Sequence, residues 1–143
     1  MPTNQACYRK LTNYKYQLME TYSIPVGIKP PQAIDTLFVS LDVDGTLTMR
    51  KSYAWDGPSG PTIDTKDFMR GSLVHDALYQ LMRLGKLAYK TDRQKADELL
   101  RDICLEDGMS KVRAWYVYKS VRLFAEPAAR PRPEQKDEII CVP

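Results

Sequence analysis

The chain has 143 residues, 21 basic and 18 acidic side chains, and a net charge of +3. This length suits a single domain with its own core, and the nearly balanced charge argues against the clustered basic surface that binds nucleic acid. Cys7, Cys104 and Cys141 lack paired spacing, so neither a disulfide framework nor a zinc ribbon is expected. No apolar run or N-terminal segment predicts a transmembrane helix or an export signal, and we expect a soluble chain.

Residues 13–54 are predicted to be rich in β-strands. Short aromatic and apolar runs between residues 14 and 28 predict one or two strands. Two further alternating runs, 37–43 and 46–50, lie on either side of Asp44-Gly45. Asp-Gly in this setting predicts a hairpin with a type I′ turn, in which both central residues have positive φ.

The same hairpin segment contains Asp42-Val43-Asp44-Gly45-Thr46 after an apolar run. It resembles the first motif of haloacid-dehalogenase phosphatases, in which a strand ends in DxDGT and the first aspartate is the nucleophile. That resemblance implies a doubly wound α/β fold, but no alternation of strands and helices follows the motif in this sequence. We therefore interpret the segment as a turn and keep a phosphatase as a minor alternative.

A loop rich in glycine, proline and aspartate is predicted at residues 55–65. Gly57 and Gly60 permit backbone conformations that turn several carbonyl groups toward one point. Together with a carboxylate such as that of Asp64, such oxygens can bind a hard cation. An ordinary connection between a sheet and a helix is the alternative interpretation.

Three helices are predicted in residues 66–124. The first covers about 66–84, and the second begins at Thr91, where Thr91 and Gln94 have the spacing of a capping box. The third covers about 110–124. The Pro-rich composition after residue 124 predicts an extended arm over 125–143.

The first helix carries the only histidine, in the motif His75-Asp76-Ala77-Leu78-Tyr79. A single histidine excludes metal sites that need several imidazoles. The short connection between the first two helices predicts antiparallel packing, which brings Asp97 of the second helix close to His75. A carboxylate bound to one imidazole nitrogen leaves the other free to take a proton from water. We expect Asp76 to point toward the Gly/Pro loop.

Residues 55–104 resemble the calcium-dependent secretory phospholipases A2, which have a glycine-rich calcium loop, a His-Asp-x-x-Tyr helix and an antiparallel helix with a buried aspartate. The resemblance implies that His75 is a general base, that Asp97 orients it and that Tyr79 supports their hydrogen bonds. Leu73 and Val74 stand where that family has paired cysteines. The resemblance also implies calcium as a cofactor, bound by Asp76, Gly57, Gly60 and Asp64.

The whole chain is similar to a family of uncharacterised proteins from tailed phages and prophages. This similarity implies a late phage protein, associated with the virion or tail or with lysis, that is present in the host cytoplasm during assembly and then in the virion. Its expected partners are other phage structural proteins, or further copies of itself bound through the arms at residues 1–12 and 126–143. The matching segments are residues 55–61, 75–79, 96–100 and 113–116.

The fold class that follows is α+β, with short antiparallel strands before a three-helix core. Residues 1–124 form the predicted domain and residues 125–143 the arm. Two functions are left open. One is a phospholipase- or esterase-like hydrolase that acts on a lipid or ester. The other is a non-catalytic virion or adaptor protein in which His75, Asp97 and Tyr79 form a hydrogen-bond network in the core.

Overall fold

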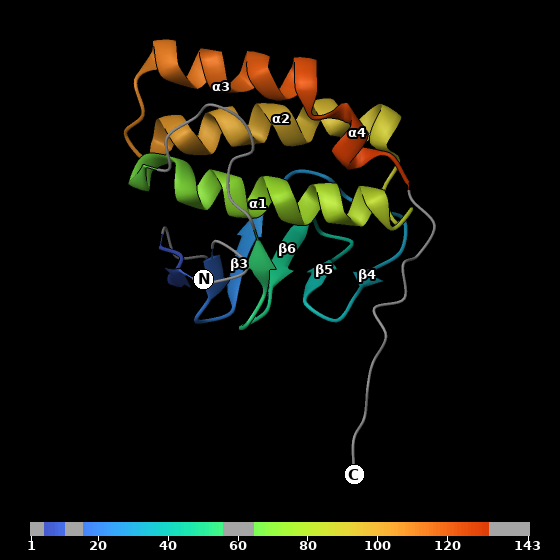
Figure 1. Cartoon of the computed structure of the whole chain (residues 1–143). Helices are drawn as coiled ribbons and strands as arrows, with labels where there is room; N and C mark the ends of the chain where they lie inside the picture. Colours follow the sequence, from blue (N-terminus) through green and yellow to red (C-terminus); the bar gives the residue numbers. More distant parts are fainter. Residues whose placement is uncertain (1–4, 11–15, 56–64, 132–143) are drawn as a thin grey trace.

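Short antiparallel strands occupy the N-terminal half of the chain, and helices occupy the C-terminal half (Figure 1). The computed structural model describes residues 5–10, 16–55 and 65–131. The strands form one sheet in the order β1-β2-β7 and another in the order β3-β6-β5-β4, with every pairing antiparallel. The predicted α+β class is therefore confirmed. The strands are β1 (Tyr8–Lys10), β2 (Tyr16–Leu18), β3 (Tyr22–Pro25), β4 (Ile34–Asp35), β5 (Val39–Leu41), β6 (Thr46–Met49) and β7 (Ala54–Trp55).

The predicted hairpin is formed by β5 and β6, but its predicted turn type is wrong. Gly45 has φ +89°, whereas Asp44 does not have positive φ. The Gly45 N–H donates to the carbonyl of Asp42 at 3.0 Å, so the turn is longer than two residues. A left-handed conformation costs an aspartate more than a glycine, and the longer turn requires it only of Gly45.

The hairpin also argues against the phosphatase alternative. Asp42 lies in the turn itself, where its carboxylate accepts the N–H of Val43 at 2.8 Å. The strand that follows returns antiparallel to the first. A haloacid-dehalogenase phosphatase instead needs its first aspartate at the end of a strand in a parallel, doubly wound sheet.

The helices are stacked in layers on the sheets. They are α1 (Lys66–Arg83), α2 (Tyr89–Glu106), α3 (Lys111–Phe124) and the short α4 (Glu126–Ala129). Figure 1 shows α1 next to the strands, α2 antiparallel to it and beyond it, and α3 farthest from the sheets. None of these described helices is long and apolar enough to cross a bilayer.

The start of α2 differs from the prediction. The helix begins at Tyr89, after Ala88, so Thr91 lies inside its first turn. The Thr91 hydroxyl donates to the carbonyl of Ala88 at 3.2 Å instead of capping an N–H group. Tyr89 packs against the core, and this contact favours a helix that starts earlier than the local capping signal suggests.

The segment predicted as the C-terminal arm contains α4. Ala129 is fully buried, and Arg83 of α1 donates a hydrogen bond to the carbonyl of Ala128 at 2.9 Å. The Pro-rich composition predicts an extended arm, but small alanine side chains let this segment pack closely on the core. Residues 132–143 lie outside the described part of the chain.

Helix α1 is buried on nearly all sides because the sheets pack on one face and α2 on another. Close packing against α2 is possible at Gly71, where a Cβ atom would lie 3.0 Å from both Cys104 Sγ and Leu100 Cδ1. The functional consequence is that polar residues on the α2 side of α1, including His75 and Tyr79, lie in the interior.

Candidate functional site

His75 and Asp97 form the predicted contact between α1 and α2. His75 Nε2 lies 2.7 Å from Asp97 Oδ1, and the hydroxyl of Tyr79 donates to the same oxygen at 2.6 Å. Asp97 is fully buried, and His75 is 7% exposed. His75 and Tyr79 lie one helical turn apart on α1, which lets both side chains reach the same carboxylate.

Two arginines complete the surroundings of Asp97. Arg122 of α3 donates to Asp97 Oδ2 at 2.9 Å. Arg93 of α2 donates to the Tyr79 hydroxyl at 3.1 Å and lies 3.9 Å from Asp97 Oδ2. Arg93 also donates to the carbonyl groups of Val121 and Arg122, which fixes the end of α3 on α2. We call these residues the Asp97 network, and it connects three helices. Its members are His75, Tyr79, Arg93, Asp97 and Arg122.

Neither arginine is among the site residues that the sequence predicts. Arg93 lies four residues before Asp97 on α2, and this spacing is a signal for an ion pair along one helix. Arg122 gives no such signal, because its contact with Asp97 depends on how α3 packs.

Electrostatics keeps Asp97 ionised and Tyr79 protonated. Burial favours the neutral form of Asp97, but hydrogen bonds from His75, Tyr79 and Arg122 outweigh it and lower the pKa of the carboxyl. Burial and the hydrogen bond to Asp97 raise the pKa of Tyr79, so its hydroxyl remains a donor. The result is a buried carboxylate that accepts hydrogen bonds from His75, Tyr79 and Arg122.

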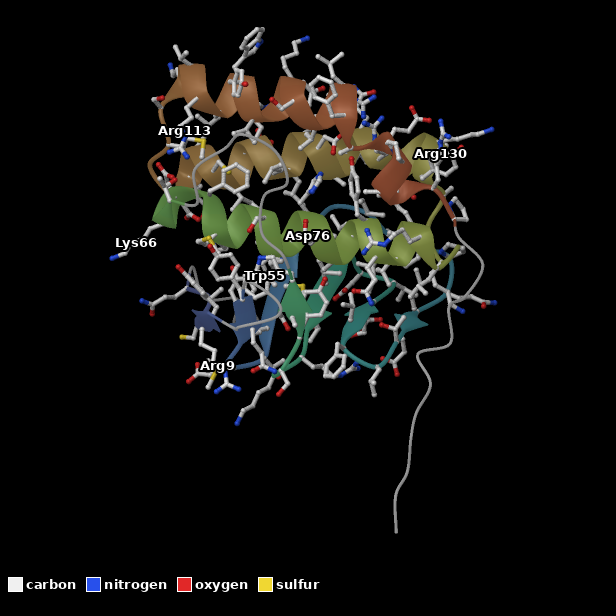
Figure 2. The ribbon with its side chains drawn as sticks, viewed as in Figure 1. Arg9, Trp55, Lys66, Asp76, Arg113 and Arg130 are labelled. Carbon is white, nitrogen blue, oxygen red and sulfur yellow. The ribbon has the colours of Figure 1, made fainter. Side chains whose placement is uncertain are left out.

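The second ring nitrogen of His75 faces a different carboxylate. Its Nδ1 lies 3.8 Å from Asp76 Oδ1, which is too long for a hydrogen bond. Burial disfavours the charged imidazolium, but the carboxylates of Asp76 and Asp97 outweigh burial and raise the pKa of His75. The side chain of Asp76 is 28% exposed, and Figure 2 shows it midway along α1.

The calcium site implied by the sequence can be tested only at Asp76. Gly57, Gly60 and Asp64 lie in residues 56–64, outside the described residues, and so does the loop toward which Asp76 was expected to point. Within the described ranges, no three His, Cys, Asp or Glu side chains form a metal-binding group. Calcium takes about six to eight oxygen ligands. Of the predicted ligands, Asp76 is the one that lies within the described residues.

A protein-family model, described as a protein of unknown function (DUF1353), matches residues 45–121. The chain belongs to the DUF1353 family. The matched region includes β6, β7, α1, α2 and most of α3, so it contains every residue of the Asp97 network except Arg122. No curated protein and no solved structure matches the chain.

Proposed function

We propose that the DUF1353 domain of this chain is a hydrolase in which His75 activates water for attack on an ester. The observation that carries the proposal is the asymmetry of the imidazole. Nε2 lies 2.7 Å from the buried Asp97 carboxylate, whereas Nδ1 lies 3.8 Å from Oδ1 of the partly exposed Asp76. Asp97 therefore favours the tautomer with hydrogen on Nε2 and leaves the Nδ1 lone pair available as a base.

The chemistry follows from that tautomer. Nδ1 takes a proton from a water molecule while the water oxygen forms a bond to the ester carbonyl carbon. The resulting tetrahedral intermediate expels an alkoxide, which takes the proton from Nδ1 and leaves as an alcohol, and the carboxylic acid is the other product. Asp97 stabilises the imidazolium between these two proton transfers, and Tyr79 and Arg122 hold Asp97 in place.

The raised pKa of His75 sets a condition on this proposal. The base must be neutral, and the carboxylates of Asp97 and Asp76 both favour the charged ring. Hydrolysis should therefore be faster in the alkaline range than near the ordinary pKa of histidine, which is about 6.5.

Calcium is part of the proposal as an ion that Asp76, Gly57, Gly60 and Asp64 would bind. When bound, it would polarise the ester carbonyl. The experiment therefore compares hydrolysis of short-chain esters and of phospholipid by the wild type with calcium and with a chelator. Loss of activity with the chelator would support the calcium site, and unchanged activity would remove it.

His75→Ala tests the base directly. It should abolish hydrolysis while circular dichroism and cooperative unfolding show a folded chain. Tyr79→Phe is the matched control, because it removes one hydrogen bond to Asp97 but retains both ring nitrogens of His75, and it should keep part of the activity. Equal rates for the wild type and His75→Ala would overturn the proposal.

A second candidate function is a non-catalytic adaptor or structural protein. It is favoured by the contacts of Asp97, which join α1, α2 and α3 through His75, Tyr79 and Arg122. A fully satisfied buried polar network can specify one arrangement of helices without chemistry. This candidate predicts that the wild type hydrolyses none of these substrates and that replacing His75 changes only stability.

We also propose a phage setting, in a late protein of the virion, the tail or the lysis machinery. The support is the resemblance of residues 55–61, 75–79, 96–100 and 113–116 to segments of proteins from tailed phages and prophages. Mass spectrometry of purified virions from a phage that encodes this chain would detect it if it is a virion component. Its absence from virions, with synthesis late in infection, would favour a role in assembly or lysis.

A further inference from the structure

The outer face of α3 is unusually apolar for a surface helix. Large apolar side chains that are each at least 50% exposed lie along it. Figure 1 shows α3 as the helix farthest from the sheets. Grouped exposure of this kind is typical of interaction sites, whereas single exposed apolar residues are ordinary. The residues are Val112, Trp115, Tyr116, Leu123 and Phe124.

Four residues of this face, together with Lys119, form one stripe on α3. Val112, Trp115, Tyr116, Lys119 and Leu123 follow one another at the spacing that places helical residues on the same side. The ammonium group of Lys119 lies 5.9 Å from the ring centre of Trp115. The stripe is therefore apolar with a cation in its middle. We call these five residues the α3 stripe.

The charge of α3 has one sign. The helix contains Lys111, Arg113, Lys119 and Arg122 and no acidic residue. Arg113 is paired with Asp67, and Arg122 with Asp97, within the same chain. Lys111 and Lys119 are exposed and remain to attract an anionic partner.

We propose that the α3 stripe is the docking site for an amphipathic helix of another protein, with acidic residues beside its apolar face. The spacing of the stripe suits a helix laid along α3, whose own apolar side chains would pack between Val112, Tyr116 and Leu123. A glutamate or aspartate of the partner would meet Lys119 at the centre of the contact.

Charge distinguishes this partner from two others. A second copy of the chain would bring the exposed Lys111 and Lys119 of one α3 against those of another, with no acidic residue on either helix. Insertion into a bilayer interior would leave Lys119 among lipid tails with no carboxylate at that depth, and binding at the surface of an anionic bilayer is the alternative that the vesicle experiment tests. An acidic helix satisfies both the apolar residues and the lysine.

The probe is a synthetic peptide of about three heptads with leucine at positions a and d and glutamate at e and g. The control peptide is identical except for lysine at e and g. Binding to the full chain is followed by tryptophan fluorescence, because Trp115 lies in the stripe while Trp55, the second tryptophan, is buried. The glutamate peptide should bind at least about tenfold more tightly than the lysine peptide.

Substitutions test whether the glutamate peptide binds at the α3 stripe. Leu123→Asp should weaken binding of the glutamate peptide at least about tenfold. Leu37→Asp should not, because Leu37, although even more exposed, lies in the connection between β4 and β5. Lys119→Glu should reverse the preference between the two peptides. Both replaced side chains on α3 are exposed, so the variants should remain folded.

Three results would overturn the proposal. The first is equal binding of the two peptides, and the second is binding that Leu123→Asp leaves unchanged. The third is an absence of peptide binding. In that case light scattering and vesicle sedimentation show what binds the α3 stripe instead. Concentration-dependent dimers would assign the stripe to a second copy, and binding to vesicles of anionic phospholipid would assign it to a membrane surface.

Discussion

Replacing Asp97 with asparagine should destabilise the fold strongly while changing the side-chain volume very little. The carboxylate is fully buried and is contacted by His75, Tyr79 and Arg122. Asparagine removes the negative charge and turns one acceptor into a donor. Arg122 and Arg93 then lie close to the side chain at position 97 without a negative charge to compensate them. Removing one partner from a buried ion pair costs about 3–5 kcal/mol. A domain of this size has a free energy of unfolding of about 5–15 kcal/mol, so Asp97→Asn should lose a large part of it.

Urea-induced unfolding followed by fluorescence measures this loss. The matched control is Asp102→Asn, on the same helix, because Asp102 is 60% exposed and pairs with Arg101 at 3.1 Å. An exposed pair contributes up to about 1 kcal/mol, so the control should unfold almost like the wild type. If Asp97→Asn also lost less than about 1 kcal/mol, the Asp97 network would not be what holds the three helices together.

Three further predictions concern the pH dependence of stability, helix packing and thiol reactivity. Because the pKa of His75 is raised on folding, its charged form stabilises the fold fully below the unfolded pKa of about 6.5, and this contribution is lost as the pH rises through the folded value. In urea unfolding at several pH values, the free energy of unfolding of the wild type should therefore fall as the pH rises from the unfolded to the folded pKa of His75. That of His75→Gln should not fall in this way. Gly71→Ala should cost about 1–3 kcal/mol in urea unfolding despite the better helix propensity of alanine, because its Cβ meets Leu100 and Cys104 at 3.0 Å, and an unchanged midpoint would contradict this packing. Burial raises the pKa of Cys104 to about 12, so mass spectrometry after thiol labelling should find exposed Cys7 modified and Cys104 modified only in denaturant.

The pairing of His75 with Asp97 could be predicted from the sequence because it depends on two strong local patterns. Both residues lie on long periodic helices, and the short connection between the helices leaves antiparallel packing as the natural arrangement. Tyr79 follows His75 by four residues, so its position on the same side of α1 is also a local property. The structure places all three together.

Features that depend on tertiary packing could not be predicted in the same way. Arg122 reaches Asp97 only because α3 packs on α2, and nothing near Arg122 in the sequence indicates that contact. Helix α4 has a composition typical of an extended arm and is held by burial of Ala129 and by Arg83. The Asp44-Gly45 dipeptide predicts a two-residue turn, but the turn that forms is longer and avoids positive φ at Asp44.

The central claim is that neutral His75 is the base in hydrolysis, and one comparison tests it most directly. The chain has a single histidine, so its imidazole gives one titrating set of proton NMR signals, and these report the pKa of His75 in the folded protein. The rate of ester hydrolysis should rise with pH and follow the same pKa as those signals. A rate that follows a different pKa, or no hydrolysis at a pH where the NMR signals show neutral His75, would contradict the claim.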